Sequence, residues 1–258
     1  MAARFLGDYD LYFAIITTWA ERLAYWANLL SWGDQGYGDE LFWGALNTIQ
    51  ISFFGYALGL SLGLLGAVGK LNGGRLVKGI LNGYTTIGRA VPELVLILLL
   101  YYAGTDAING LLKTLGHGPI EINGLIASIF VLGIVQGAYS TEVLRAAIQA
   151  VPLGQSEAAK AFGMGPILQF RRITLPAMLP NALPGLSNLW LNITKDSALV
   201  SVVGFGELAL ATKQAAGMNK QYMLLYAVAM AIYILISRST WFFTMLENRL
   251  RRGQRALG

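Results

Sequence analysis

Charged side chains inside long apolar stretches are the residues of this sequence best suited to chemistry. Lys195 and Asp196 are adjacent within one such stretch, and Glu93 and Glu142 each interrupt another. Ionisable groups within membrane spans are costly, so each is a candidate for function. Lys195 and Asp196 offer the opposite charges that a zwitterionic amino acid needs. The alternative is that they pair with each other or with neighbours and only hold helices together.

Glu93 directly follows Pro92. A proline in a membrane helix frees backbone groups, which is tolerated where the backbone lines a cavity. Glu93 is therefore a candidate for the wall of a substrate path. The alternative is an ion pair with Arg89, which lies one helical turn earlier.

Glu142 lies near the end of another apolar stretch, three residues before Arg145. This spacing favours an ion pair at a helix end. Glu142 is nevertheless kept as a candidate for the substrate path, together with Tyr139, whose ring is equally suited to packing. Acidic groups at 93, 142 and 196 would suit a basic substrate.

Residues for covalent catalysis or metal binding are scarce. The chain has no cysteine and one histidine, His117. Disulfides and cysteine-ligated metals are therefore excluded, and we expect neither a histidine-based metal site nor a Ser–His pair. The stretch GLLGAVGKL differs from a phosphate-binding loop in its glycine spacing and in the leucine after the lysine. We predict no enzyme activity, catalytic residue, metal or cofactor on this chain, so energy for transport would come from a partner.

The composition is that of an integral membrane protein. Hydrophobic residues make up 55% of the 258 residues and charged residues 13%, about half of what is usual in soluble domains. The 31 glycines suit helices that pack closely in lipid. The net charge is +5, but the sequence contains no basic patch interleaved with aromatic residues, so we expect no nucleic-acid partner.

The hydropathy pattern predicts an all-α bundle with five membrane spans. A helix needs about 20 apolar residues to cross a hydrocarbon core of about 30 Å. The stretches that meet this need are 41–69, 83–104, 124–144, 183–203 and 222–243. Gly55, Gly59 and Gly63 recur every fourth residue, which places them on one face for close helix contact.

Residues 11–31 are apolar and rich in tryptophan and tyrosine, but they contain Glu21 and Arg22. A span here would place both charges near the middle of the bilayer. We therefore predict a helix that lies on the membrane surface, with a sixth span as the alternative.

Positive charge is concentrated in three segments: the connection after the first span, residues 157–176, and the C-terminal tail. Five spans place all three on the same side, which the positive-inside rule makes cytoplasmic. The N-terminus is then predicted on the outer side of the membrane and the C-terminus in the cytoplasm.

Residues 157–176, EAAKAFGMGPILQFRRITLP, form a compact charged module within this apolar chain. The first six residues have high helix propensity. The break Gly-Met-Gly-Pro at 163–166 predicts a turn, and ILQFRRI predicts a second short helix. We expect the prolines at 176, 180 and 184 to redirect the chain into the fourth span.

The spacing EAA-x3-G-x9-I-x-L-P in this module resembles the EAA loop of ABC importer permeases. Three further segments, GYTTIGRAVPELVLILLLYY, GAYSTEVLRAAIQAVP and LPGLSNLWLNITKDSALVSVVGFGEL, resemble the polar amino-acid permeases, in particular the Q-type subunits of histidine, lysine, arginine, ornithine and opine importers. The matching positions of the loop are Glu157, Ala158, Ala159, Gly163, Ile173, Leu175 and Pro176.

The resemblance implies a five-span, MetI-like type I permease core in a bacterial inner membrane, with a periplasmic N-terminus and a cytoplasmic C-terminus. It divides the chain into an N-terminal extension (1–40), a permease domain (41–246) with its coupling loop at 152–176, and a basic tail (247–258). Glu157 and Gly163 would be the contact and the hinge of a coupling helix that docks on a cytoplasmic ATPase dimer.

The partners that the resemblance implies are that ATPase dimer, which binds ATP and magnesium, a periplasmic amino-acid-binding protein, and a second homologous permease or a second copy of this chain. Membrane lipid would surround the assembly. The implied function is import of polar, basic amino acids.

Two other functions would also suit a helical membrane protein. An ion-coupled transporter or channel would act without an ATPase, and the intact EAA spacing argues against it. A scaffold or sensor would have no use for Lys195, Asp196 and Pro92 within apolar spans, because such residues are costly in lipid.

Overall fold

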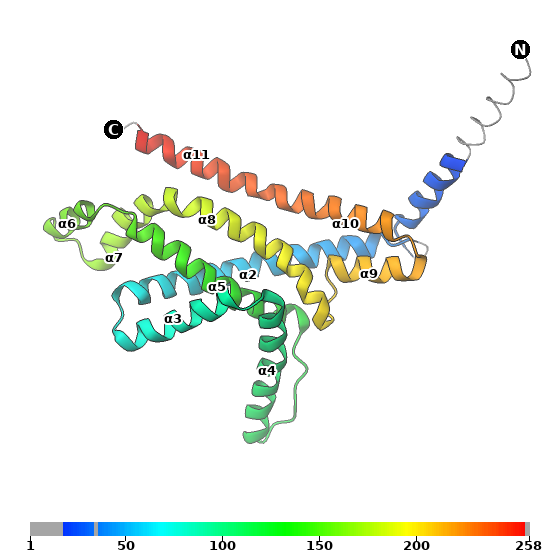
Figure 1. Cartoon of the computed structure of the whole chain (residues 1–258), viewed down its shortest axis with the longest axis horizontal. Helices are drawn as coiled ribbons and strands as arrows, with labels where there is room; N and C mark the ends of the chain where they lie inside the picture. The colour runs from blue at the N-terminus through cyan, green and yellow to red at the C-terminus, as the bar shows by residue number, and fades with distance from the viewer. Residues whose placement is uncertain (1–17, 34–35, 256–258) are drawn as a thin grey trace, which may run out of the picture.

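Long helices lie side by side along one axis of the molecule. The computed structural model describes residues 18–33 and 36–255, and every regular element in these ranges is helical. Figure 1 shows α2 (Gly38–Asn72), α5 (Gly124–Gln149) and α8 (Leu175–Asp196) running along the bundle. Three successive C-terminal elements follow the same direction: α10 (Tyr222–Ser237), the short η3 (Arg238–Thr240) and α11 (Trp241–Arg255). The predicted all-α bundle is confirmed.

Helices α2 and α5 form a tight seam, as the glycine spacing predicted. A Cβ on Gly59 would lie 2.8 Å from the Gln136 side chain, and one on Gly63 would lie 2.9 Å from the carbonyl carbon of Ser140. Both distances are shorter than real contacts, so only glycine lets the backbones approach this closely. Gly55 faces the same seam.

The second predicted span, 83–104, is divided between two helices, with the break at Pro92 that the sequence indicated. Residues 83–90 belong to α3 (Arg75–Ala90), and residues 93–104 belong to α4 (Glu93–Thr114). Between them Val91 is extended, with φ −91° and ψ 136°, because a residue before proline avoids helical angles. Helix α4 consequently leaves the bundle at a steep angle and is mostly exposed (Figure 1).

Four helical segments of the described chain are long and apolar enough to cross a membrane: Gly38–Asn72, Glu93–Thr114, Gly124–Gln149 and Tyr222–Leu250. The fourth predicted span, 183–203, lies in α8 and η2 (Ser197–Val203) and is not among them, because the prolines and asparagines of α8 lower its mean hydropathy. Helix α8 nevertheless packs against α5 and α11 in the main core.

The prediction that prolines turn the chain before the fourth span is wrong. Pro180 and Pro184 lie inside α8, and Pro176 lies in its first turn. Packing of α8 against neighbouring helices maintains the helix although each proline lacks an N–H donor.

A second, smaller core joins the N-terminal region to the end of the bundle. Leu29 and Leu41 pack there with α9 (Leu208–Asn219) and α10. Residues 18–29 are helical, with Trp19 and Tyr25 exposed. Residues 11–17 of the predicted surface helix lie outside the described residues, and its position on the membrane remains a prediction.

Candidate functional site

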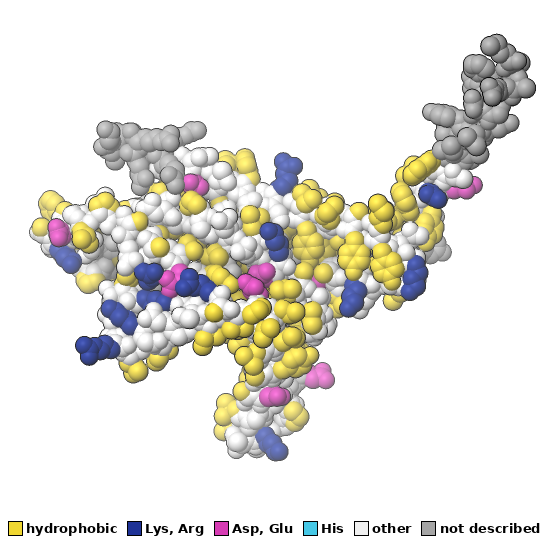
Figure 2. Space-filling model, in the orientation of Figure 1, with side chains coloured by type: hydrophobic (Ala, Val, Ile, Leu, Met, Phe, Trp, Pro, Cys, Tyr) yellow, Lys and Arg dark blue, Asp and Glu magenta, His cyan; other side chains and the backbone are white. Residues whose placement is uncertain are grey.

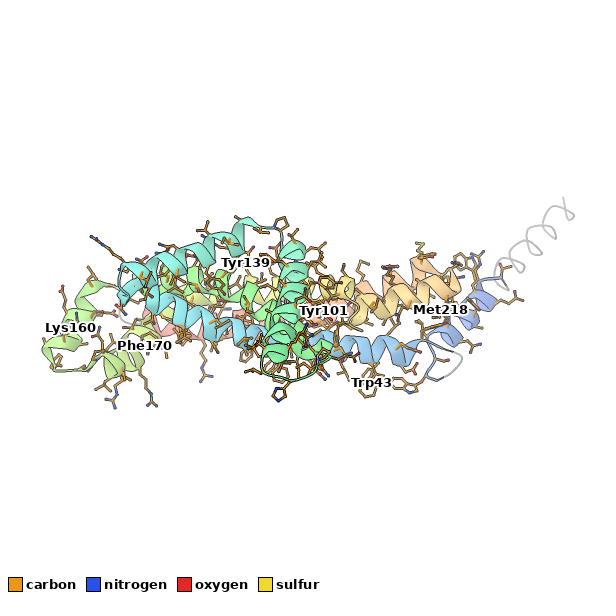
Figure 3. The ribbon with its side chains drawn as sticks, turned by 90° about the horizontal axis from the view of Figure 1, so that it is seen from below. Trp43, Tyr101, Tyr139, Lys160, Phe170 and Met218 are labelled. Carbon is orange, nitrogen blue, oxygen red and sulfur yellow. The ribbon has the colours of Figure 1, made fainter. Side chains whose placement is uncertain are left out.

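The EAA module forms a protruding knob at one end of the molecule. We call residues 153–174 the knob; it consists of α6 (Leu153–Ala161), α7 (Pro166–Gln169) and the π-helical turn η1 (Phe170–Thr174). Figure 1 shows α6 and α7 beyond the ends of α2 and α5, and Figure 3 places Lys160 at the tip and Phe170 at the base. The predicted order of helix, break and helix is confirmed.

A left-handed glycine makes the turn between the two short helices. Gly163 has φ +73°, a conformation that other residues rarely adopt. The Met164 N–H donates to Ala159 O at 3.0 Å and the Gly163 N–H to Lys160 O at 2.9 Å, the pattern of a Schellman motif. No atom lies within 4 Å of a Cβ built on Gly163, so backbone conformation alone demands glycine there.

The outward surface of the knob combines a charge with uncovered apolar side chains. Glu157 and Ala158 are exposed, whereas Ala159 is 2% exposed. Phe162 and Ile167 are each 85% exposed. Large apolar side chains with this exposure, beside a charged group, are typical of a surface that a partner protein covers.

The last part of the motif faces the bundle instead. Ile173 is half-buried, and Leu175 packs against the main core. Through η1 the helix continues directly from α7 into α8, so Pro176 belongs to α8. The motif therefore joins an exposed contact surface to a helix of the bundle.

A cavity of about 850 Å³ separates the knob from the bundle. Val68 at the end of α2 and Val151 at the end of α5 line one side, and Lys160 and Phe170 line the other. The knob therefore has space on its inner side, whereas Phe170 at its base packs against the main core.

A second candidate site lies where α4, α5 and α8 meet. The Tyr139 hydroxyl donates to Glu93 Oε1 at 2.8 Å. Asp196 is the last residue of α8 and directly precedes η2, which packs against both α4 and α5. Figure 3 shows Tyr139 near the junction of α3, α4 and α5. The structure thus brings together three of the five predicted substrate-path residues; we call Glu93, Tyr139 and Asp196 the acidic cluster.

The other two candidates lie in different surroundings. Lys195 is exposed and forms no ion pair with Asp196. Glu142 is bound by Lys70 at 2.5 Å and by Arg145 at 2.8 Å, which confirms the predicted ion pair with Arg145.

The suggested pair between Arg89 and Glu93 does not form. The Arg89 Nε–H donates to the Thr85 carbonyl at 3.2 Å, within its own helix. The break at Pro92 separates the two side chains onto helices with different directions.

Sequence reasoning missed a buried carboxylate at Glu207. Its side chain is 0% exposed and accepts hydrogen bonds from the N–H groups of Ala209 and Leu210, both at 2.9 Å. The Tyr233 hydroxyl donates to it at 2.9 Å and Thr48 at 3.3 Å. Glu207 therefore caps α9 and links it to α2 and α10. The signal was an acidic residue directly before an apolar helix.

The family of the chain follows from comparison with known proteins. Residues 55–252 match the model of the family described as binding-protein-dependent transport system inner membrane component. The chain belongs to this family. It is a membrane-spanning permease subunit of an ATP-driven importer, so ATP hydrolysis belongs to a separate ATPase subunit, and a substrate-binding protein delivers the cargo.

Two relatives cover most of the chain. A nopaline transport system permease from Agrobacterium fabrum is 41% identical over 235 residues, which are 88% of this chain and 98% of the relative. A histidine/lysine/arginine/ornithine transport system permease from Escherichia coli is 41% identical over 213 residues, which are 83% of this chain and 90% of the relative.

Solved structures confirm the MetI-like type I fold. An amino acid ABC transporter crystallised with histidines superposes with a TM-score of 0.68 at 30% identity and covers 83% of this chain and 95% of that chain. An inward-facing methionine ABC transporter shares the fold, with a TM-score of 0.59 at 22% identity, over 83% of this chain and 94% of that chain. These findings do not support an ion-coupled transporter or channel that acts alone.

Proposed function

We propose that this permease imports basic amino acids. The observation that carries the proposal is the acidic cluster, in which the half-buried carboxylates of Glu93 on α4 and Asp196 on α8 come from different helices that meet at α5. The names of the relatives, which include histidine, lysine, arginine and ornithine, support the same class of cargo.

The chemistry of the acidic cluster suits a cation. The Glu93 carboxylate is oriented by Tyr139, whereas Asp196 accepts no hydrogen bond from the described residues. Two neighbouring carboxylates repel each other, and an ammonium or guanidinium group between them would relieve that repulsion. The side chain of a basic amino acid supplies such a group.

The knob would transmit the motion of the ATPase. In this proposal Glu157 and the exposed Phe162 and Ile167 dock in a cleft of the ATPase, and Gly163 preserves the turn between the two short helices. Closure of the ATPase dimer on ATP and magnesium would move the knob, and the bundle would rock between outward and inward access. The cavity behind the knob supports this role, because it leaves the knob room to move.

A second homologous permease, or a second copy of this chain, would cover α4. Val95, Leu99 and Tyr102 on this helix are each more than half exposed, and an apolar groove of about 400 Å³ runs between α4 and α5. Lipid of the inner membrane would cover the remaining apolar surface, with the N-terminus in the periplasm and the C-terminus in the cytoplasm.

The test measures binding and uptake of arginine by the permease reconstituted with its ATPase and binding protein. Asp196→Asn removes a negative charge without changing shape, and we expect arginine to bind the permease about tenfold more weakly, as for the loss of a charge-assisted hydrogen bond. Lys195→Gln is the matched control, because Lys195 is adjacent and exposed. Unchanged binding and uptake of several amino acids in Asp196→Asn would remove Asp196 from the substrate site.

A further inference from the structure

A polar groove lies between α2, α3 and α5, on the knob side of the acidic cluster. It has a volume of about 360 Å³, within the range of small-molecule sites. Four of the side chains that line it are cations, and one is a carboxylate: Lys70, Lys78, Arg89, Arg145 and Glu142. We call this the basic groove. Figure 2 shows dark blue and magenta side chains gathered over α3 and α5 on this face.

Helix α3 presents a polar stripe to the groove. Lys78, Asn82, Thr85 and Arg89 follow each other at intervals of four, three and four residues, which places them on one face of the helix. The stripe extends from the first turn of α3 to its last turn, four residues before Glu93 in the chain. The groove therefore leads from the acidic cluster toward the knob.

The hydrogen bonds of the groove leave positive charge unmatched. Both Glu142 oxygens are occupied, Oε1 by Lys70 and Oε2 by Arg145. Lys78 has no ion-pair or hydrogen-bond partner in the described part of the chain. Arg89 uses only its Nε–H, so its four terminal N–H groups are free of acceptors there. Two cations with free donors thus face a groove whose only carboxylate is already neutralised.

We propose that the basic groove binds the α-carboxylate of the amino acid after it leaves the acidic cluster. This inference rests on the proposed function, which supplies a substrate with a carboxylate at one end and a cation at the other. The acidic cluster would hold the cationic end. The free donors of Lys78 and Arg89 would then receive the carboxylate on the side toward the cytoplasm.

Phosphate shares this chemistry, either as the free ion or as a lipid headgroup. The structure favours the amino acid, because Arg89 at the end of the polar stripe is only four residues before Glu93 of the acidic cluster, across the break at Pro92. The experiment below distinguishes the three anions.

The experiment measures ATP-driven arginine uptake in proteoliposomes that contain the complete transporter, with the binding protein outside and ATP with magnesium inside. The lumen is preloaded with arginine, with arginine amide, or with inorganic phosphate, in vesicles with and without anionic lipid. For the unaltered chain we expect lumenal arginine to slow uptake by occupying the groove, whereas the amide and phosphate do not. Lys78→Gln should weaken this inhibition about tenfold, the effect of losing one charge-assisted hydrogen bond.

Two variants separate binding from structure. Lys78→Arg keeps the charge and should restore inhibition. Arg75→Gln removes an exposed cation of the same helix that does not line the groove, and it should behave like the unaltered chain.

The outcomes separate the two proposals. Normal uptake with equal inhibition in Lys78→Gln would overturn the groove assignment and leave the proposed function intact. Equal inhibition by phosphate, or inhibition only in vesicles with anionic lipid, would assign the groove to phosphate groups and also overturn it. Failure of the unaltered transporter to take up arginine would overturn both proposals.

Discussion

The α2–α5 seam and the knob use glycine for opposite purposes. In the seam, Gly59 and Gly63 permit contact, because a Cβ at either position would collide with α5. In the knob, Gly163 permits a turn, and the space around it is empty. The seam is buried by its partner helix, whereas Phe162 and Ile167 of the knob are uncovered.

This difference in burial indicates that the α2–α5 seam is a rigid part of the molecule and that the knob is a surface for binding a partner. Close-packed helices resist deformation, so α2 and α5 should move as one unit. The knob touches the main core through Phe170, has a cavity on its inner side, and leaves Phe162 and Ile167 exposed on its outer side. A displacement of the knob would therefore pass to the bundle through η1 and α8, with which the knob is continuous in the chain.

The largest effect is expected from breaking the seam. Gly63→Ala places a Cβ against the backbone of Ser140, and we expect a loss of about 3 kcal/mol in stability from overpacking. Thermal unfolding in mild detergent measures it. Gly83→Ala is the control, since nothing lies within 4 Å of a Cβ there. Equal melting temperatures for both variants would contradict the tight seam.

Altering the contact surface of the knob should leave stability unchanged and reduce coupling. Glu157 is exposed, so Glu157→Ala removes no contact of the isolated chain that supports the fold. We expect affinity for the ATPase to fall about tenfold, or about 1.4 kcal/mol, and transport to fall with it. Co-purification with the ATPase measures this.

The matched control for that variant is Gln155→Ala, an exposed position of the same helix outside the EAA motif. If Glu157→Ala kept full ATPase binding and transport, the knob would not be the coupling element.

A smaller effect is expected at the turn of the knob. In Gly163→Ala the new side chain must be accommodated in a left-handed backbone conformation, which costs about 1 kcal/mol of stability. We therefore expect α6 to fray at its C-terminal end. Hydrogen exchange at the Met164 amide, which bonds to Ala159, should accelerate while the seam stays protected. Acceleration in α2 and α5 to the same extent would show that knob and bundle are not separate units.

The smallest effect is expected from Gly154→Ala in α6. This glycine is helical and has open space around it, so alanine should stabilise the helix by up to about 1 kcal/mol. Uptake should not change. A loss of uptake would indicate that the partner approaches the backbone at Gly154.

Much of this molecule could be predicted from local sequence signals. The apolar run from 41 to 69 lies within α2, the spacing of Gly55, Gly59 and Gly63 marked the seam, and the EAA spacing marked the knob. Each signal depends on residues within a few helical turns of each other. Helix length, helix faces and turns are determined by residues that are near each other in the sequence.

Predictions that depended on distant contacts were less successful. Glu142 was considered with Arg145 alone, but it also binds Lys70, which lies 72 positions earlier. The prolines at 176, 180 and 184 were expected to redirect the chain, and α8 instead runs through them because it packs against α5 and α11. Buried Glu207 was missed because two of its partners, Thr48 and Tyr233, lie on other helices.

The amino-acid sequence by itself determined that this chain is a helical membrane protein with a charged, glycine-hinged module, because hydropathy, spacing and backbone preference are local properties. Only the tertiary structure decided which charges are already neutralised and which are free. Glu142 and Asp196 look alike in sequence, yet one is held by two cations and the other accepts no hydrogen bond from the described residues. That distinction depends on how separate helices pack, since an ion pair forms only when two charged groups come within about 4 Å of each other.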